Sequence, residues 1–259
     1  MKKIEIKEFG GPEVLEIKNV DIGKPGQKEV LVKNLSIGIN YIDTYHRSGL
    51  YPIPLPSGIG LEACSIIEEV GSGVRLFKVG DRVTRASMPI GTYSEKQIIP
   101  EDKLVKVPDN ISDEVASCIT LKGITAEYLL HRTYQVKKGD KILYHAAAGA
   151  LGQIFCPWAN ALGAEIIGTV GSDEKIEIAK KNGCHHVINY NEKNFVEEVE
   201  KIVGKNGLDV VYDGVGAKTF EGSIEVLKVR GMMVAFGNAS GYVHTCLLYT
   251  SDAADEADG

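Results

Sequence analysis

A glycine-rich bend between an apolar run and an amphipathic stretch is the strongest chemical signal in the chain. The segment KGDKILYHAAAGALGQIF contains the pattern Ala147-x-Gly149-x-x-Gly152. At a strand-to-helix turn, Gly149 lets the backbone approach a pyrophosphate and Gly152 lets the helix and strand pack closely. The helix N-terminus then offers unpaired amides to the anion. The pattern predicts a dinucleotide site, although glycines at such a turn can also serve tight packing alone.

A second feature of the sequence indicates which dinucleotide binds at this site. About 20 residues beyond the glycines, NAD enzymes carry Asp or Glu for the ribose hydroxyls. This chain has Val170-Gly171-Ser172 at that distance. Without a carboxylate the site does not repel a 2′-phosphate, and Lys175 is able to pair with one. We therefore expect NADPH and name Lys175 as the discriminating residue, the alternative being an ordinary solvent-facing lysine in a first helical turn.

The glycine bend lies in a half of the chain with βαβ spacing. From about Gly139 onward, β-branched runs alternate with longer amphipathic stretches, as a parallel, doubly wound sheet requires. Helices are expected to begin near Ala150, Asp173, Asn194 and Thr219. Strands are expected at 141–147, 165–170, 186–190, 209–215 and 231–237, five where six are usual.

The first half has a different pattern. Short β-type runs separated by Gly, Pro and Asp predict a small β-rich domain, with strands expected at 2–9, 14–20, 30–40, 65–71, 81–87 and 92–100. Residues 108–134 are expected to be helical, with Ser112 as the N-cap and Glu114 in the first turn. The predicted domains are 1–121 and 122–242.

Composition excludes several classes of protein. Hydrophobic residues make up 44% and charged residues 25%, as in soluble globular proteins, and we found no apolar run long enough for a membrane-spanning helix. The N-terminus alternates apolar and charged residues, which favours a cytoplasmic protein over a secreted one.

The net charge of -6 disfavours nucleic-acid binding, although a local basic groove stays open. Five dispersed cysteines suggest reduced thiols, without a disulfide framework or zinc ribbon.

A series of motifs carries a specific resemblance: GGPEVL, IGINYIDTYHRSGLYP, LPSGIGLEA, VGSGV, GDRV, LKGITAEYLL, HAAAGALG, INY, VVYDGVG and AFGNASG. From Met1 to about Gly241 the chain resembles bacterial quinone oxidoreductases of the zeta-crystallin type, in the medium-chain dehydrogenase/reductase superfamily. The resemblance implies an α/β protein with a GroES-like β-rich domain and a Rossmann domain that is incomplete at the C-terminus. It also implies NADPH and substrate in the cleft between the domains, and a homodimer in full-length relatives.

The same resemblance implies a set of cofactor contacts. In the first domain and the bridging helix they are Asn40, Tyr41, Ile42, Asp43, Thr44, Tyr45 and Tyr128. In the second domain they are Gly149, Ala150, Leu151, Gly152, Gly171, Ser172, Lys175, Tyr190, Val215, Phe236, Gly237, Asn238 and Ala239. Each has an alternative, since aromatic residues at the ends of apolar strands often only pack.

The zinc-containing relatives in this superfamily offer a contrast. They carry Cys where this chain has Asn40, and His before Glu where it has Leu61-Glu62. Two zinc ligands are missing, and so is the cysteine-rich lobe that would bind a structural zinc. We therefore expect no metal.

Without a Lewis acid, the substrate carbonyl must already be electron-poor or conjugated. Quinones and enones meet this requirement. Asn40, Tyr45 and Tyr51 are the candidate catalytic donors to the developing oxyanion, against a purely positioning or packing role. His46 is expected at the surface, without a role as proton donor. Two other classes stay open: a crystallin-like or nucleic-acid-binding protein without turnover, and a zinc alcohol dehydrogenase.

The sequence departs from the family pattern twice. Pro157 lies inside the helix after the glycine turn, where it is expected to cost about 3 kcal/mol and to kink the helix. The segment 243–259 contains CLLYTSDAADE, which resembles translated sequencing-adapter DNA. We expect this tail to be non-native and roughly 80 further family residues to be missing. The homodimer is then doubtful for this chain.

Overall fold

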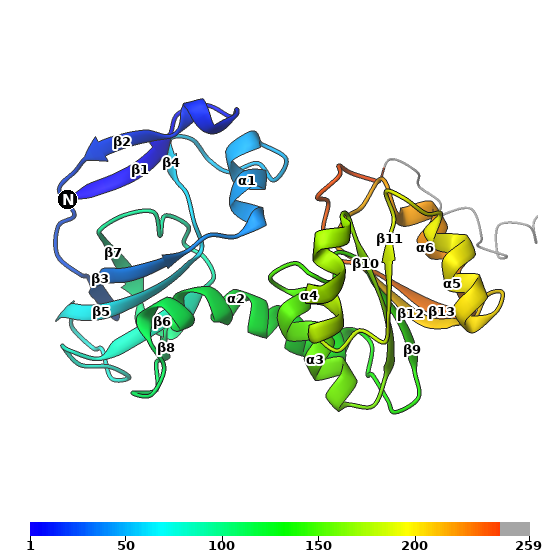
Figure 1. Ribbon diagram of the computed structural model, residues 1–259. Helices are drawn as coiled ribbons and strands as arrows, with labels where there is room; N and C mark the ends of the chain where they lie inside the picture. The colour runs from blue at the N-terminus through cyan, green and yellow to red at the C-terminus, as the bar shows by residue number, and fades with distance from the viewer. Residues whose placement is uncertain (244–259) are drawn as a thin grey trace, which may run out of the picture. The chain divides into compact units, whose positions relative to one another are not determined.

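A computed structural model describes residues 1–243 of the chain, which divides into two units, Met1–Ile124 and the residues from Thr125 on (Figure 1). Each unit has its own sheets and its own buried core. Within the described residues, no helix has the length and apolar character needed to cross a membrane.

The first unit is built on two antiparallel sheets. The smaller has the order β2-β1-β4, from β1 (Lys2–Ile6), β2 (Glu16–Asn19) and β4 (Ser57–Gly58). The larger has the order β7-β3-β5-β6-β8, from β3 (Glu29–Gly38), β5 (Glu62–Val70), β6 (Arg82–Ala86), β7 (Lys96–Pro100) and β8 (Val105–Lys106). Residues that alternate along the strands of the larger sheet, including Val30, Val32 and Ile67, form a buried core.

Helical segments join the strands of the first unit. Two single 3₁₀ turns occur, η1 (Pro12–Val14) and η2 (Glu101–Lys103). Helix α1 (Tyr41–Ser48) follows β3 directly and was not expected. It begins because Asn40 adopts an extended N-cap conformation and its backbone N–H donates to Asp43 Oδ2 at 2.9 Å. It ends because Gly49 takes the left-handed conformation, with φ 80°.

Helix α2 (Asp113–Tyr128) begins in the first unit and ends in the second. Its N-terminus confirms the predicted cap, since the Val115 amide donates to Ser112 Oγ at 3.3 Å. A π-helical turn, η3 (Leu129–Thr133), continues it. Leu129 and Leu130 of that turn are fully buried in the core of the second unit.

The second unit is a parallel five-stranded sheet with the order β11-β10-β9-β12-β13. Its strands are β9 (Lys141–Tyr144), β10 (Glu165–Val170), β11 (His186–Asn189), β12 (Leu208–Asp213) and β13 (Leu227–Ala235). The strand order reverses between β9 and β12, which is where a doubly wound sheet binds ligands at its carboxyl edge. The predicted parallel sheet is therefore confirmed.

Helices cover both faces of this sheet (Figure 1). They are α3 (Gly152–Ala161), the 3₁₀ turn η4 (Asp173–Lys175) with α4 (Ile176–Lys181), α5 (Phe195–Val203) and α6 (Phe220–Glu225). Neighbouring strand residues point to opposite faces, so Ile142 and Tyr144 pack with Phe155 of α3 while Leu143 packs with Val199 of α5. Strands buried on both faces explain the continuous apolar runs in the sequence.

Pro157 lies inside α3, and the helix runs through it from Gly152 to Ala161. Proline has no backbone N–H, so the carbonyl of Gln153 loses its usual helical donor. The expected tail, 243–259, lies outside the described residues except for Val243.

Candidate active site

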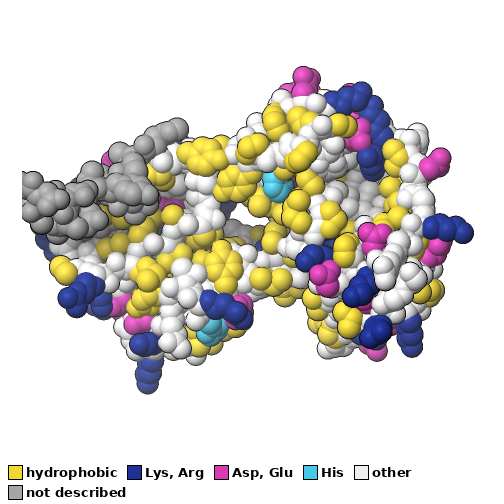
Figure 2. Space-filling view, turned by 180° about the vertical axis from the view of Figure 1, so that it is seen from behind, with side chains coloured by type: hydrophobic (Ala, Val, Ile, Leu, Met, Phe, Trp, Pro, Cys, Tyr) yellow, Lys and Arg dark blue, Asp and Glu magenta, His cyan; other side chains and the backbone are white. Residues whose placement is uncertain are grey.

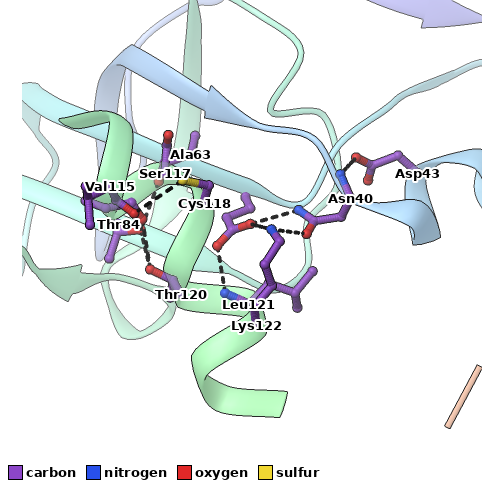
Figure 3. Close-up of polar contacts among 12 residues, drawn as sticks. Asn40, Asp43, Ala63, Thr84, Val115, Ser117, Cys118, Thr120, Leu121 and Lys122 are labelled. Carbon is purple, nitrogen blue, oxygen red and sulfur yellow. Dashed lines mark hydrogen bonds and ion pairs between the residues drawn. The ribbon is translucent and has the colours of Figure 1, made fainter. Parts of the chain in front are cut away.

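The candidate residues fall into three groups, one in the first unit and two at the carboxyl edge of the parallel sheet. The first group surrounds the start of α1. Asn40 is 8% exposed, and its side chain lies between two charged groups. Its Nδ2 donates to Glu62 Oε2 at 2.8 Å, and its Oδ1 accepts from Lys122 Nζ at 2.7 Å. Figure 3 shows the Asn40 and Lys122 side chains pointing toward one another, from the loop after β3 and from α2.

Three tyrosines of the first group pack against one another. The ring centroids of Tyr41 and Tyr45 lie 5.3 Å apart, and those of Tyr45 and Tyr51 lie 5.0 Å apart. Tyr45 is buried, whereas Tyr41 is 61% exposed. Ile42 and Thr44 are half-buried on the same helix, and the Thr44 hydroxyl donates to the Tyr41 carbonyl at 2.6 Å. The structure thus brings Asn40, Tyr45 and Tyr51 into one region of the first unit.

Asp43 and His46 lie on the buried side of α1. Asp43 Oδ2 accepts from the backbone N–H of Asn40 and from the Tyr93 hydroxyl, the latter at 2.8 Å. Burial raises the pKa of Asp43 and lowers that of His46. The expectation of a surface histidine was wrong, because His46 is 8% exposed and its ring lies at the inner side of the short helix that sequence patterning missed. Asp43 Oδ1 and His46 Nδ1 have no hydrogen-bond partner among the described residues.

The second group is the glycine turn between β9 and α3. A Cβ on Gly152 would lie 2.3 Å from the Ala147 carbonyl oxygen, so the close approach of helix and strand requires glycine at this position. Ala146, which precedes the turn, has a left-handed backbone with φ 58°. Among residues 1–243, the backbone amides of Ala150 and Leu151 donate to no acceptor. The turn therefore presents free N–H groups beside the start of α3, as an anion site requires.

Four further candidates lie near this turn, at the carboxyl ends of β10 and β11. Gly171 and Ser172 follow β10, Lys175 closes the turn η4, and Tyr190 follows β11. A Cβ on Gly171 would lie 3.2 Å from the Tyr190 hydroxyl, so the two loops are in close contact. Lys175 is exposed. The first carboxylate after β10 is Asp173, which accepts from Asn189 Nδ2 at 2.8 Å.

The third group follows β12 and β13. Phe236 packs over Gly214, where an added Cβ would lie 2.9 Å from its ring. The backbone of the two loops is linked, because the Ala239 amide donates to the Gly214 carbonyl at 3.3 Å. Val215, Gly237 and Asn238 lie in the same pair of loops. Tyr128, the last residue of α2, packs against the core of the same unit, and burial raises its pKa.

A buried polar network under the third group was missed by sequence reasoning. His145 contacts Thr169 Oγ1 through Nδ1 and Ser223 Oγ through Nε2, both at 2.9 Å. Ser223 in turn donates to Asp213 Oδ2 at 3.3 Å. The only available signal was a run of polar residues at the ends of apolar strands. Burial lowers the pKa of His145 to about 4.

On the face of the molecule shown in Figure 2, basic and acidic side chains are interspersed and form no large patch of one charge. Within residues 1–243, no cluster of three or more His, Cys, Asp or Glu side chains has an arrangement that could hold a metal ion.

A GroES-like β domain followed by a dinucleotide-binding parallel sheet defines a medium-chain dehydrogenase or reductase. Two family models match accordingly: the alcohol dehydrogenase GroES-like domain over residues 26–109 and the zinc-binding dehydrogenase over residues 150–252.

Individual relatives narrow the class. The quinone oxidoreductase of Pseudomonas aeruginosa is 49% identical over 93% of this chain and 75% of its own length. The 2-haloacrylate reductase of a Burkholderia species is 48% identical over 91% of this chain and 73% of its own length. The Escherichia coli quinone oxidoreductase, solved in complex with NADPH, superimposes with a TM-score of 0.93 over 96% of this chain and 76% of its own, at 49% identity. The chain belongs to the quinone oxidoreductase family.

Proposed function

We propose that this protein is an NADPH-dependent oxidoreductase that reduces quinones or other conjugated carbonyl compounds. The observation that carries the proposal is the glycine turn at the switch point of the parallel sheet, with its free amides and with Gly171, Ser172 and Lys175 beside it. Relatives at about half identity are quinone oxidoreductases and a 2-haloacrylate reductase, and a similar structure contains NADPH.

The residues present fit the cofactor. The amides of Ala150 and Leu151 are free to bind the pyrophosphate. Lys175 is exposed at the adenosine end, and of the two carboxylates in the same turn Asp173 is held by Asn189 whereas Glu174 is exposed. A 2′-phosphate would therefore meet a cation there. When bound, NADPH supplies the hydride.

The chain's own residues have three tasks in this reaction. The apolar and aromatic side chains around Tyr45 orient a planar substrate and exclude water. Asn40 has one N–H of Nδ2 engaged with Glu62 and a second N–H available for a carbonyl oxygen. Such a donor stabilises the negative charge that develops on that oxygen. Tyr45 and Tyr51 are the further candidate donors.

The proposal extends to the remaining candidates and to the setting of the protein. We assign cofactor contacts to Tyr41, Ile42, Thr44, Tyr128, Tyr190, Val215 and the loop 236–239, and we divide the chain near residue 121. We also place the enzyme in the cytoplasm. The net charge of -6 disfavours nucleic acid as its partner.

The test is a steady-state assay with the purified chain. NADPH absorbance should fall when a quinone or an enone is added, and NADPH should be used at lower concentration than NADH. A folded preparation that binds NADPH and turns over no member of such a panel contradicts the proposal.

A further inference from the structure

Glu62 and Lys122 form an ion pair in the first unit, and both contact the side chain of Asn40. Glu62 is fully buried and the Lys122 side chain is 14% exposed. Lys122 Nζ lies 3.2 Å from Glu62 Oε2 and 2.7 Å from Asn40 Oδ1. The other carboxylate oxygen, Oε1, accepts from the Leu121 amide at 2.7 Å. Both carboxylate oxygens are therefore bonded, and a buried charge with these partners is held in one orientation.

The position of Lys122 is fixed by how α2 packs on the sheet. Ser117 Oγ lies 2.8 Å from Ser36 Oγ on β3. Thr84 Oγ1 on β6 donates to the Ala116 carbonyl at 3.1 Å and lies 2.9 Å from Thr120 Oγ1 (Figure 3). On the β3 side, a Cβ on Gly38 would lie 1.9 Å from the Ser117 carbonyl oxygen. One helical turn before Lys122, α2 therefore has little freedom to shift.

The two charges dictate which way the Asn40 amide faces. In the observed orientation, the NH₂ group donates to a carboxylate and the carbonyl oxygen accepts from an ammonium. A rotation by half a turn would place the NH₂ group against the Lys122 ammonium and the amide oxygen against Glu62. Both new contacts would be repulsive, donor facing donor and acceptor facing acceptor. Glu62 alone would leave the Oδ1 side of the amide without a partner.

We propose that Lys122 is a positioning residue that fixes the Asn40 amide with its second N–H as the group presented to substrate. This inference rests on the proposed function, in which Asn40 stabilises the oxyanion. Lys122 acts through Asn40, so its own contact with substrate is not required.

The first test is kinetic and uses Lys122→Met, which keeps most of the side-chain length and removes the charge. We expect kcat for quinone reduction to fall about tenfold to a hundredfold, with KM for NADPH changed less than about threefold. Lys122→Arg should recover part of the rate, and ethylammonium added to Lys122→Ala should do so as well. Lys137→Met makes the same change at an exposed lysine and should keep the original rate.

A double-variant cycle separates positioning from general stability. If Lys122 acts through Asn40, the variant carrying both Asn40→Ala and Lys122→Met is no slower than Asn40→Ala alone. Losses that multiply would overturn the proposal. Should Lys122→Met fail to fold, as shown by its thermal melt, Lys122→Arg and amine-treated Lys122→Ala provide the same comparison.

A second readout does not depend on activity. In ¹⁵N-labelled protein, the two side-chain amide protons of Asn40 should have well-separated shifts, since one donates to a carboxylate. Lys122→Met removes the ammonium donor from the Asn40 amide oxygen and should therefore move the side-chain ¹⁵N and ¹H resonances of Asn40, and unchanged shifts would overturn the proposal. If the original chain reduces no quinone or enone, the proposed function fails, while this measurement still decides whether Lys122 orients Asn40.

Discussion

Asp213 Oδ2 accepts the hydroxyl hydrogen of Thr219 at 2.7 Å, which ties the end of β12 to the start of α6. The other oxygen, Oδ1, accepts from the amides of Val215 and Gly216 at 2.7 and 3.0 Å. Asp213 is 1% exposed, so these donors have no access to water as a substitute. One carboxylate therefore organises the loop that contains the candidate residue Val215.

Asp213→Ala should lower the free energy of unfolding by about 3 kcal/mol, because it leaves several buried donors unpaired. Urea unfolding at neutral pH measures the change. Asp109→Ala removes the same side chain at an exposed position and should change the free energy by less than about 0.5 kcal/mol. Equal effects of the two substitutions would show that the Asp213 network contributes little.

His145 predicts a specific dependence of stability on pH. Its pKa is lowered from the ordinary 6.5 to about 4 by burial. Between these two pH values the unfolded chain binds a proton that the folded chain does not, so stability falls as the pH falls through this window. Acidification from pH ~6.5 to about 4 should therefore cost about 3 kcal/mol of folding stability through His145. Above pH ~6.5 His145 should cause no such loss.

The measurement is urea unfolding at several pH values for the original chain and for His145→Gln. The variant should lose less stability on acidification, although it is less stable at neutral pH. His186→Gln, at an exposed position, serves as the control. A parallel acid dependence in the original chain and His145→Gln would mean that His145 does not titrate as described.

Gly152 and Gly123 both lie in helices, and the structure gives them opposite predictions. A Cβ on Gly152 would clash with the Ala147 carbonyl, whereas one on Gly123 meets nothing within 4 Å. Gly152→Ala should therefore destabilise the second unit by about 1–3 kcal/mol and weaken NADPH binding, because the turn must shift. Gly123→Ala should stabilise by about 0.5–1 kcal/mol through helix propensity. Thermal melts and cofactor titrations test both substitutions. Unchanged stability and NADPH affinity in Gly152→Ala would contradict the prediction.

Lys175→Ala tests the assignment of the adenosine phosphate site. Loss of the cation should raise the dissociation constant for NADPH by about tenfold, and that for NADH by much less, because only NADPH carries the 2′-phosphate. Fluorescence titration with each cofactor gives both constants. Lys181→Ala, an exposed lysine at the end of α4, should leave them unchanged. Equal losses for NADPH and NADH would sink the assignment.

Most of the parallel sheet could be predicted because its signals are local. The glycine turn after β9, the apolar runs and the Ser112 cap each occupy a few consecutive residues. The parallel direction of the strands follows from the βαβ spacing, since parallel neighbours need a crossover connection between them. The motifs in family order supplied the identity of the two domains.

Helix α1 escaped prediction for a physical reason. It has eight residues, follows directly on a ten-residue strand, and its cap uses Asp43 in place of the usual Glu or Gln. The apolar run 30–40 therefore appeared to be one strand. The position of His46 followed this error, since its burial depends on which side of α1 packs inward.

Long-range polar contacts were equally inaccessible. Lys122 and Glu62 are 60 residues apart in the chain, and His145 and Ser223 are 78 apart. No periodicity relates such pairs, because tertiary packing alone brings them together. The Asn40 position was singled out from the family pattern, but the charges that orient its amide became visible only in the structure.

Hydride transfer from NADPH to a conjugated carbonyl compound is tested most directly by isotope tracing. NADPH deuterated at the transferable position of the nicotinamide C4 should react with a panel of enones and quinones more slowly than unlabelled NADPH. We predict that the reduced enone carries carbon-bound deuterium in proportion to the NADPH consumed. Folded protein that binds NADPH without oxidising it, or an enone product free of carbon-bound deuterium, would contradict the account.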